Sequence, residues 1–392
     1  METYLRYIKQ MIVPRVIKKV NTPHDCYIIL TARCNQRCLH CYGNYGMNVP
    51  PNELTGNEWD KVFADLVKNN IFYVNISGGE PTVHPDFIEI LESLKRYQLH
   101  FIITTNGLFN EKVLNAFIEV KDLLIGIKIS LDGPDYISNG YIRRNIKKEV
   151  SESDFNKTIR NLRALKKNGI PFTIATCIHK GNINRMDDLL KLVLDLKPVS
   201  WFISTISTSG RSFNNLDIFS SDSEIDKKEW DRIKDICNKN DIFVNFIDMP
   251  SANAIKNSNE IYYQCPAARS FCEINSDGLV SPCPLARVNI PPEFLKFENI
   301  KTKSIKEIWN GEPFKRFLEL SEQGCRGCKV KEKCDRCVPQ SILWFNNPEF
   351  PPPYCIQNGR NLGLDNVKDL KKLLKNKMIG YERDNYINIK EE

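Results

Sequence analysis

The amino-acid sequence lacks the long hydrophobic runs that mark secreted and membrane proteins. Charged residues fall in every turn of residues 1–22, so no signal peptide is predicted, and no later run is long and apolar enough to cross a bilayer. Charged residues of one sign are not clustered in the sequence either. The net charge of +7 is spread through the chain, which argues against binding to nucleic acid or to a membrane. We therefore expect a cytoplasmic protein.

Cysteine, in contrast, is abundant. The 392 residues include 14 cysteines, and disulfide bonds are rare in the reducing cytoplasm, so metal ligation is the expected use of most of them. With 42% hydrophobic and 26% charged residues, the chain can bury a sizeable core. Its length fits an α/β barrel with an appended region.

Three of the cysteines follow the first expected strand. Residues 26–31 form a short apolar run, and Cys34, Cys38 and Cys41 come after it in a C-x3-C-x2-C pattern. Thiolates at such spacing suit an iron–sulfur cluster, zinc or copper(I). A cubane cluster normally takes four cysteines, so this loop would leave one iron open. The alternative is a structural zinc loop that takes a fourth ligand from elsewhere.

A glycine-rich turn, formed by Gly78, Gly79 and Glu80, follows the second expected strand. Glycine has no Cβ, so the backbone can approach a ligand closely. Together with the three-cysteine loop one strand–helix unit earlier, this turn resembles the radical S-adenosylmethionine (SAM) superfamily. The resemblance implies that Cys34, Cys38 and Cys41 hold a 4Fe–4S cluster whose open iron binds SAM. One electron from the cluster would then cleave SAM to methionine and a 5′-deoxyadenosyl radical.

Strands and helices alternate from Cys26 to roughly Ile247, which predicts a parallel sheet with right-handed crossovers. About six strand–helix units are too few for a closed barrel of eight, so we expect an α/β fold with a partial (β/α)6-type barrel, as the resemblance also implies. The expected strands span residues 26–31, 72–76, 100–104, 123–129, 171–176, 199–204 and 242–247. The first expected helix starts after Thr55. Further helices are expected over residues 85–97, 154–168, 184–196 and 224–238.

The predicted division of the chain has four parts: an N-terminal extension (1–25), the barrel (26–250), a cysteine-rich domain (251–360), and a C-terminal helix with a charged tail (361–392). Every motif named so far follows a strand, and the carboxyl ends of the strands are where barrels gather their chemistry. We therefore expect one site at that end of the sheet.

Further residues at the strand ends resemble family segments that contact SAM. Asn106 lies in a Thr-Asn-Gly turn, and Ser130 begins a Ser-Leu-Asp-Gly turn similar to the segment that contacts the SAM ribose. Each could also belong to an ordinary turn. Arg143 or Arg144 resembles the family arginine that pairs with the SAM carboxylate, and we favour Arg143. His40 could lie near the adenine or be solvated.

Eight cysteines fall between residues 265 and 355, where few regular strands or helices are expected. Their spacing resembles the SPASM domain of radical SAM maturases, except that Cys334 and Cys337 are one residue closer than usual. The resemblance implies two auxiliary 4Fe–4S clusters, cluster I with Cys265, Cys272, Cys283 and Cys337, and cluster II with Cys325, Cys328, Cys334 and Cys355. A zinc-ribbon-like module is the alternative. We expect the three remaining cysteines to be small buried hydrophobes: Cys26, Cys177 and Cys237.

The resemblance also indicates a function. Fully ligated auxiliary clusters carry electrons, and an enzyme that forms a new bond after hydrogen abstraction must dispose of a second electron. We predict an oxidising radical SAM maturase that modifies a ribosomally made peptide or protein by a thioether or carbon–carbon crosslink or a related Cα or Cβ change. Maturation of a small cofactor, such as a quinone or tetrapyrrole, is the second hypothesis. A non-catalytic electron carrier or cluster scaffold is the third.

Two kinds of partner are expected. The N-terminal extension is too short for the winged-helix leader-binding domain that many peptide maturases carry, so we expect direct recognition of the peptide or a separate leader-binding partner. Reduction of the SAM-binding cluster calls for an external electron donor such as flavodoxin or ferredoxin. No carboxylate or tyrosine stands out as a general acid or base, so none is assigned.

Overall fold

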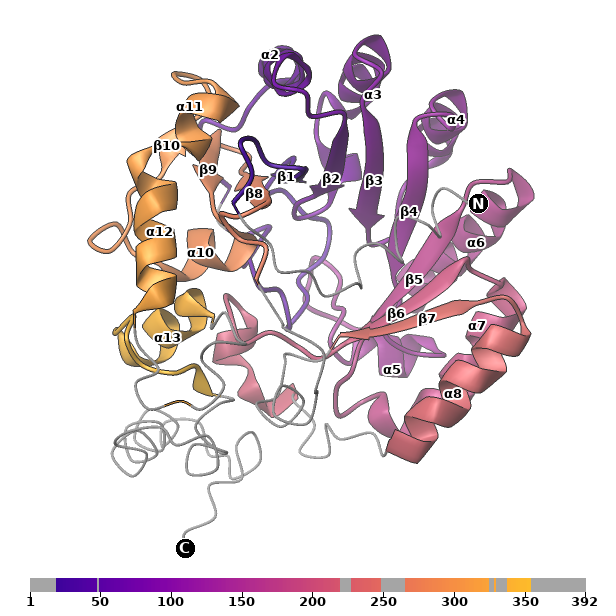
Figure 1. Ribbon diagram of the computed structural model, residues 1–392. Helices are drawn as coiled ribbons and strands as arrows, with labels where there is room; N and C mark the ends of the chain where they lie inside the picture. The colour runs from indigo at the N-terminus through magenta and orange to yellow at the C-terminus, as the bar shows by residue number, and fades with distance from the viewer. Residues whose placement is uncertain are drawn as a thin grey trace, which may run out of the picture.

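The computed structural model describes residues 19–47, 49–218, 227–247, 265–323, 328 and 337–353. One curved sheet forms its centre, and helices cover the outer side of the sheet (Figure 1). The predicted C-terminal helix and most of the N-terminal extension lie outside these ranges. Within the described part of the chain, no helix is long and apolar enough to cross a membrane.

Ten strands form the sheet, in the order β10-β9-β8-β1-β2-β3-β4-β5-β6-β7. Neighbours from β8 to β7 pair in parallel, whereas β9 and β10 are antiparallel additions at one edge. The strands are β1 Asp25–Ile29, β2 Tyr73–Ser77, β3 His100–Thr105, β4 Leu124–Ser130, β5 Phe172–Cys177, β6 Ser200–Ser204, β7 Phe243–Ile247, β8 Phe271–Ile274, β9 Leu279–Ser281 and β10 Glu298–Asn299. All seven predicted strands are confirmed. In the described part of the chain, β7 and β10 form the two edges of the sheet and do not pair with each other, so the predicted open barrel is confirmed as well.

The five predicted barrel helices are present, and the structure adds two more. A capping box between Thr55 and Glu58 starts α2, as predicted, because each residue's side chain accepts a backbone N–H of the other. The helices are α2 Gly56–Lys68, α3 Phe87–Arg96, α4 Glu111–Glu119, α5 Tyr136–Gly140, α6 Glu152–Lys167, α7 Met186–Leu196 and α8 Lys227–Lys239. The prediction missed α4 and α5 because each is short and buries few apolar side chains.

The cysteine-rich region contains more regular structure than predicted. Besides β8, β9 and β10 it forms α10 Pro284–Asn289, α11 Ile305–Trp309, α12 Glu312–Glu322 and α13 Val338–Phe345. Strand β8 pairs in parallel with β1, so that Cys272 lies opposite Cys26. The sheet therefore continues from the barrel into the cysteine-rich region. The boundary expected at residue 250 lies outside the described residues, and the four-part division of the chain stays a prediction.

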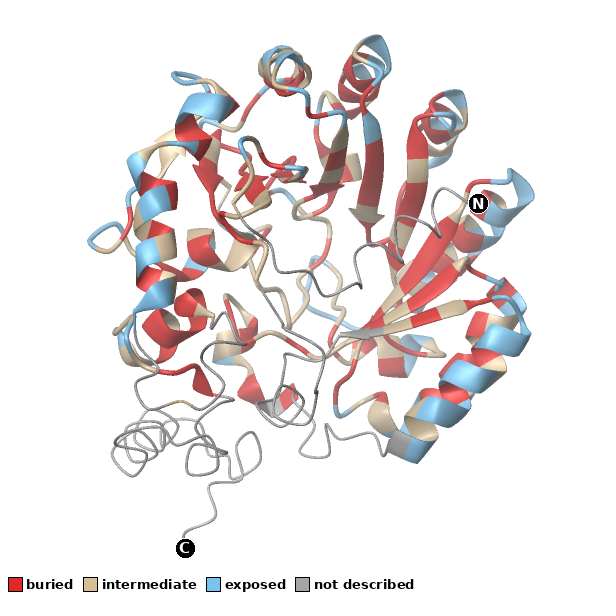
Figure 2. Cartoon of the chain, in the orientation of Figure 1, coloured by how far each residue is buried: buried red, intermediate tan, exposed pale blue. Residues whose placement is uncertain are grey.

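The two faces of the sheet have different neighbours. On β1, Cys26 points into the main core between sheet and helices, whereas the next residue, Tyr27, packs on the opposite face beside the cysteine loop. Figure 2 shows buried strands enclosed by helices whose outer sides are exposed. Cys26 and Cys237 are fully buried, as predicted. Cys177, at the end of β5, is only partly buried.

Candidate functional site

A cavity of about 180 Å³ lies at the carboxyl ends of β1 to β4. Parallel strands bring the loops that follow them to the same end of the sheet, so residues far apart in sequence meet there. Predicted site residues in its wall are Cys34, Cys38, Cys41, Gly78, Gly79, Asn106, Ser130 and Arg143. His40 also lines the cavity. Of the predicted SAM-binding residues, Glu80 alone is absent from the wall.

Hydrogen-bond donors lie beside all three sulfurs of the cysteine loop. Backbone N–H groups donate to Cys34 Sγ at 3.4 Å and to Cys41 Sγ at 3.3 Å, and Arg143 Nη1 lies 3.9 Å from Cys38 Sγ. Such donors stabilise sulfur that carries negative charge. Burial raises the pKa of the Cys38 thiol to about 11, although the Arg143 charge opposes the rise. Ligation to a metal would drive off this proton.

The two glycines of the predicted turn pack against the start of the cysteine loop. A Cβ on Gly78 would lie 2.5 Å from Thr31 O, and a Cβ on Gly79 would lie 2.2 Å from Arg33 O. Gly78 also has a φ of +147°, which side chains rarely adopt. From the sequence, these glycines were expected to allow a ligand to approach. In the structure, packing within the protein requires glycine at both positions, because the turn lies directly against the backbone that enters the cysteine loop.

Glu80 connects the turn after β2 to the turn after β3. Its fully buried carboxylate accepts hydrogen bonds from Thr105 Oγ1 and from Asn106 N, each at 2.7 Å. Asn106 Nδ2 in turn donates to Asn35 Oδ1, in the cysteine loop, at 2.7 Å. Burial raises the pKa of Glu80, and these hydrogen bonds oppose the rise. Glu80 thus shapes the cavity through its neighbours, and its direct contact with SAM stays a prediction.

Arg143 lies between an aspartate and the cysteine loop. Arg143 Nε is 2.5 Å from Asp132 Oδ2, and Arg143 Nη2 is 3.5 Å from His40 Nε2. Asp132 Oδ1 also accepts a hydrogen bond from Cys177 N at 2.6 Å. Because Arg143 lines the cavity and Arg144 does not, the geometry favours the predicted choice of Arg143.

The charges around Arg143 are fixed near neutral pH. Burial pushes the pKa of Asp132 upward, but the Arg143 charge and the hydrogen bond from Cys177 N help to hold that pKa below its usual value. Burial, and then the Arg143 charge, lower the pKa of His40 to about 3, and burial lowers the pKa of His179 to about 4. Both imidazoles are therefore neutral, while Asp132 and Arg143 remain ionised. The η nitrogens of Arg143 can thus donate to a carboxylate in the cavity.

Arg211, another residue of the cavity wall, was not predicted from the sequence. Its Nη1 donates to Cys38 O at 2.7 Å, and its Nη2 donates to Tyr45 O at 2.8 Å. The preceding Gly210 has a φ of +56°, and a Cβ there would lie 2.2 Å from a backbone oxygen of the cysteine loop. Arg211 therefore holds the loop from the side of β6. A Gly-Arg pair after a strand is the local sequence signal, and it is too common to have identified this role.

Three predicted ligands of auxiliary cluster I lie near one another. Cys283 caps α10, Cys337 precedes α13, and these two helices pack together. Burial raises the pKa of Cys283, and the nearby Cys265 and Cys337 raise it further. The fourth predicted ligand, Cys272, instead has its Sγ 3.6 Å from Cys26 Sγ. Its ligation of cluster I stays a prediction.

Most of the predicted ligands of auxiliary cluster II lie outside the described residues. Cys328 is one of its predicted ligands and lies within the described residues, whereas Cys325, Cys334 and Cys355 lie outside them. Every cysteine in the described ranges is a free thiol, as metal ligation requires. Cluster II therefore stays a prediction.

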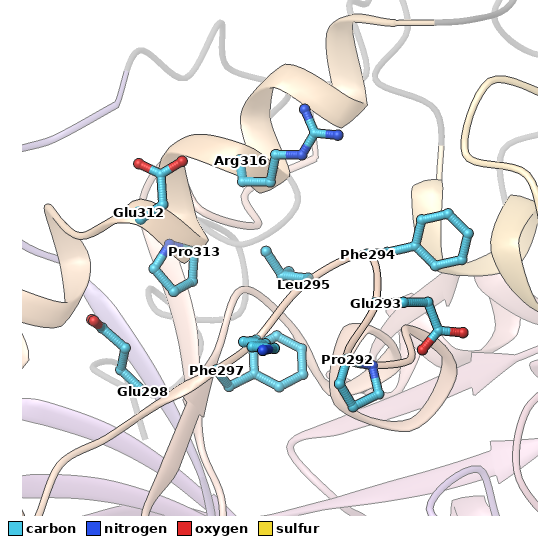
Figure 3. A pocket seen from close by; sticks show the side chains of 10 residues that line it. Pro292, Glu293, Phe294, Leu295, Phe297, Glu298, Glu312, Pro313 and Arg316 are labelled. Carbon is cyan, nitrogen blue, oxygen red and sulfur yellow. The ribbon is translucent and has the colours of Figure 1, made fainter.

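A second hollow, of about 450 Å³, lies between residues 292–298 and helix α12 (Figure 3). Its floor is apolar, with Leu295, Phe297 and Pro313, and charged side chains such as Glu293 stand around it. None of the cysteines predicted to hold a cluster lines this hollow. We therefore assign it no part of the chemistry.

The residues around the 180 Å³ cavity fit an iron–sulfur cluster with SAM. Among the described residues, no three or more His, Cys, Asp or Glu side chains converge as the ligands of one metal ion do. The three thiols of the loop instead all line the cavity, and a cubane takes its ligands at separate corners. Arg143 supplies a fixed positive charge in the same lining, as the SAM carboxylate requires.

Two family models match the chain. The model of the radical SAM superfamily matches residues 28–193, and that of the SPASM iron–sulfur cluster-binding domain matches residues 265–337. The first contains the cysteine loop, the glycine turn and Arg143. The second contains seven of the eight cysteines of the cysteine-rich region, from Cys265 to Cys337.

Relatives of similar length support both matches. Mycofactocin maturase MftC of Mycobacterium ulcerans is 26% identical over 356 residues, which cover 88% of this chain and 92% of the relative. AdoMet-dependent heme synthase of Methanosarcina barkeri is 25% identical over 365 residues, which cover 87% of this chain and 98% of the relative.

Solved structures show the same fold. Streptococcus suis SuiB bound to S-adenosylmethionine superposes with a TM-score of 0.70 at 17% identity, over 90% of this chain and 80% of SuiB. SuiB bound to its precursor peptide SuiA superposes with a TM-score of 0.68 at 18% identity, over 90% of this chain and 79% of SuiB. Together with the cysteine loop and the glycine turn, the two family-model matches show that the chain is a radical SAM enzyme with a C-terminal SPASM domain.

Proposed function

We propose that this radical SAM enzyme oxidatively modifies a ribosomally made peptide, through a thioether or carbon–carbon crosslink or a related change at Cα or Cβ. The observation that carries the proposal is the cavity that Cys34, Cys38, Cys41 and Arg143 all line. The similarity to a mycofactocin maturase and to a SuiB structure with bound precursor peptide supports a peptide as the substrate.

The residues predicted to bind the cluster and SAM have separate tasks in this proposal. Cys34, Cys38 and Cys41 hold a 4Fe–4S cluster, which together with bound SAM supplies a 5′-deoxyadenosyl radical. Arg143 binds the SAM carboxylate through its η nitrogens, and Asp132 keeps the guanidinium oriented. Asn106 and Ser130 contact the nucleoside.

The loop around SAM is held by residues that need not touch it. Gly78 and Gly79 pack on the backbone that enters the cysteine loop, and Arg211 donates to two of its carbonyl groups. Glu80 fixes the turn that carries Asn106. In the proposed reaction these contacts keep the radical precursor in one orientation and restrict the access of water to it.

We also propose two auxiliary 4Fe–4S clusters, which makes three clusters per chain. Cluster I would use Cys265, Cys272, Cys283 and Cys337, and cluster II would use Cys325, Cys328, Cys334 and Cys355. These ligands would give the enzyme a place for the electron that bond formation releases. Because β8 pairs directly with β1, the ligands of cluster I are tied to the strand that leads into the SAM cavity.

A small cofactor is the second candidate substrate. The 25% identity to an AdoMet-dependent heme synthase over most of both chains favours a tetrapyrrole in that case. For either substrate we propose a cytoplasmic enzyme that receives electrons from a flavodoxin or ferredoxin. For a peptide substrate, a separate leader-binding partner would supply recognition of the leader.

Mass spectrometry separates the two candidates. The anaerobically reconstituted enzyme is incubated with SAM, dithionite and the short peptide encoded beside its gene. We expect the peptide to lose two hydrogens for each crosslink, with 5′-deoxyadenosine formed in step. An unmodified peptide, together with turnover of a tetrapyrrole, would reverse the order of the two candidates.

A further inference from the structure

A lysine lies on the face of the sheet that lines the SAM cavity. Lys128 is two residues before Ser130 on β4, and it pairs in register with Thr104 on β3. Both Ser130 and Thr104 are in the cavity wall. Because residues i and i+2 of a strand, and partners in register, share a face, Lys128 faces the interior of the barrel next to these two wall residues, although it is not itself part of the wall.

The ammonium of Lys128 has unusual surroundings. Its Nζ lies 4.4 Å from the centroid of the Phe202 ring, on β6. Asp25, on β1, attracts it from a distance, and the Asp25 carboxylate already accepts a hydrogen bond from Asn75 Nδ2 at 2.7 Å. Within the described part of the chain, Lys128 Nζ has neither a hydrogen-bond acceptor nor an ion pair.

This arrangement is costly without an anion in contact. Burial lowers the pKa of Lys128 to about 8, and the attraction to Asp25 offsets only part of that effect. Lys128 is partly buried, and a charge that has lost much of its contact with water is normally paired, because a distant partner returns less than the lost hydration costs. The three N–H donors of Lys128 and the adjoining cavity are therefore suited to an anionic group brought in by a ligand.

We propose that Lys128 binds a carboxylate of the substrate and thereby determines which part of the substrate faces the SAM cavity. This inference rests on the proposed function, because carboxylates are the anionic groups of a ribosomally made peptide. The carboxylate can come from an Asp or Glu side chain or from the peptide's C-terminus. Asp25 would oppose the binding, since its charge is negative and it lies on the same face of the sheet.

Binding measurements with the peptide encoded beside the gene test the proposal. The peptide is made in several forms: one with all its carboxylates intact, one with an amidated C-terminus, and others in which an Asp or Glu is replaced by its amide. Affinity for the reconstituted enzyme with SAM, but without reductant, is measured by fluorescence anisotropy. We expect one amide form to bind wild type roughly 30-fold or more weakly, which is the usual effect of removing one partner of a buried charge pair. That form identifies the source of the carboxylate.

Variants then assign the effect to Lys128. Lys128→Met should weaken binding of the full peptide to the same degree and should no longer distinguish the amide forms. Asp25→Asn should bind the full peptide at least as tightly as wild type. Lys121→Met, an exposed lysine just before the same strand, is the matched control and should bind as wild type does. Circular dichroism and iron content establish that each variant is folded.

Several results would overturn the assignment. It fails if every amide form binds the wild-type enzyme as tightly as the full peptide does, a result that needs no variant. It also fails if Lys128→Met still binds the amide forms with different affinities. It also fails if Asp25→Asn loses as much affinity as Lys128→Met, because the cause would then be packing and not charge. The proposed function fails separately, when the wild-type enzyme neither binds nor modifies the full peptide.

Discussion

Arg143 Nε lies 2.5 Å from Asp132 Oδ2, and the two side chains are only 11% and 0% exposed. Asp132 is fixed in turn by the backbone N–H of Cys177, at the end of β5. The guanidinium is therefore held with its η nitrogens towards Cys38 and His40 on the cavity wall. This orientation is the reason that Arg143 is the residue proposed to bind the SAM carboxylate.

Replacing Asp132 by Asn should weaken SAM binding. The change keeps the shape of the side chain but leaves the buried Arg143 charge unpaired, and an outer partner of this kind typically changes affinity by about 10- to 100-fold. The readout is the change that SAM causes in the electron paramagnetic resonance spectrum of the reduced cluster. Arg143→Met should abolish the change, whereas Arg144→Met should retain it. An unaltered SAM response in Asp132→Asn would contradict the assignment.

Replacing Arg211 by Met should loosen the cysteine loop. The variant loses the hydrogen bonds to Cys38 O and Tyr45 O, and hydrogen bonds from a charged donor contribute about 1.5–3 kcal/mol each. We expect faster bleaching of the SAM-binding cluster in air, followed by its visible absorbance. The control is Arg185→Met, whose ion pairs with Asp135 and Asp188 lie at the surface and contribute little to stability. Equal bleaching rates in the two variants would exclude a role for Arg211 in holding the loop.

Adding a single methyl group to Gly79 should destabilise the protein strongly. The new Cβ would lie 2.2 Å from Arg33 O, a backbone atom, so the cysteine loop must shift. Gly169 offers a matched comparison, since a Cβ there meets nothing within 4 Å and only its φ of +67° is unfavourable, at about 1 kcal/mol. Gly79→Ala should cost roughly 2 kcal/mol more than Gly169→Ala and should reduce the iron content. Denaturant unfolding of both variants makes the comparison, and equal losses would show that the packing at Gly79 is not tight.

The partly buried Lys128 should make stability depend on pH above neutrality. Its pKa is about 8 in the fold and 10.5 in the unfolded chain, so between these values only the unfolded chain holds the proton. The measured quantity is the difference in the free energy of unfolding between wild type and Lys128→Met. This difference should shift in favour of wild type as the pH rises from about 8 to 10.5, and it should not change with pH below 8. Urea unfolding under nitrogen, followed by tryptophan fluorescence, measures it. A difference that stays constant from pH 7 to 10 would show that the ammonium is well solvated.

Contiguous motifs made much of the site predictable from the sequence. Cys34, Cys38 and Cys41 lie within eight residues, and Gly78 and Asn106 belong to short turns after apolar strands, so spacing alone indicated a shared site. Parallel strands then bring those turns together, as the cavity confirms. The strands themselves were predictable because each is an apolar run bounded by polar residues.

Long-range contacts could not be predicted in the same way. Arg211 reaches carbonyl groups more than 160 residues earlier in the chain, and such a contact leaves no mark in its neighbours. The pairing of β8 with β1 was missed because β8 has four residues and no strand–helix unit around it. Lys128 lies in a strand that reads as apolar, and only the register with Thr104 places it beside the cavity.

The most direct test of the account is whether the cysteine loop supports cleavage of SAM. Anaerobically reconstituted protein is given SAM and dithionite, and 5′-deoxyadenosine is measured by chromatography alongside the iron content. The account predicts 5′-deoxyadenosine from wild type with roughly twelve irons per chain, and none from a variant with Cys34, Cys38 and Cys41 replaced by Ala, which should keep roughly eight irons. Intact SAM after incubation with the iron-loaded wild-type protein would contradict it.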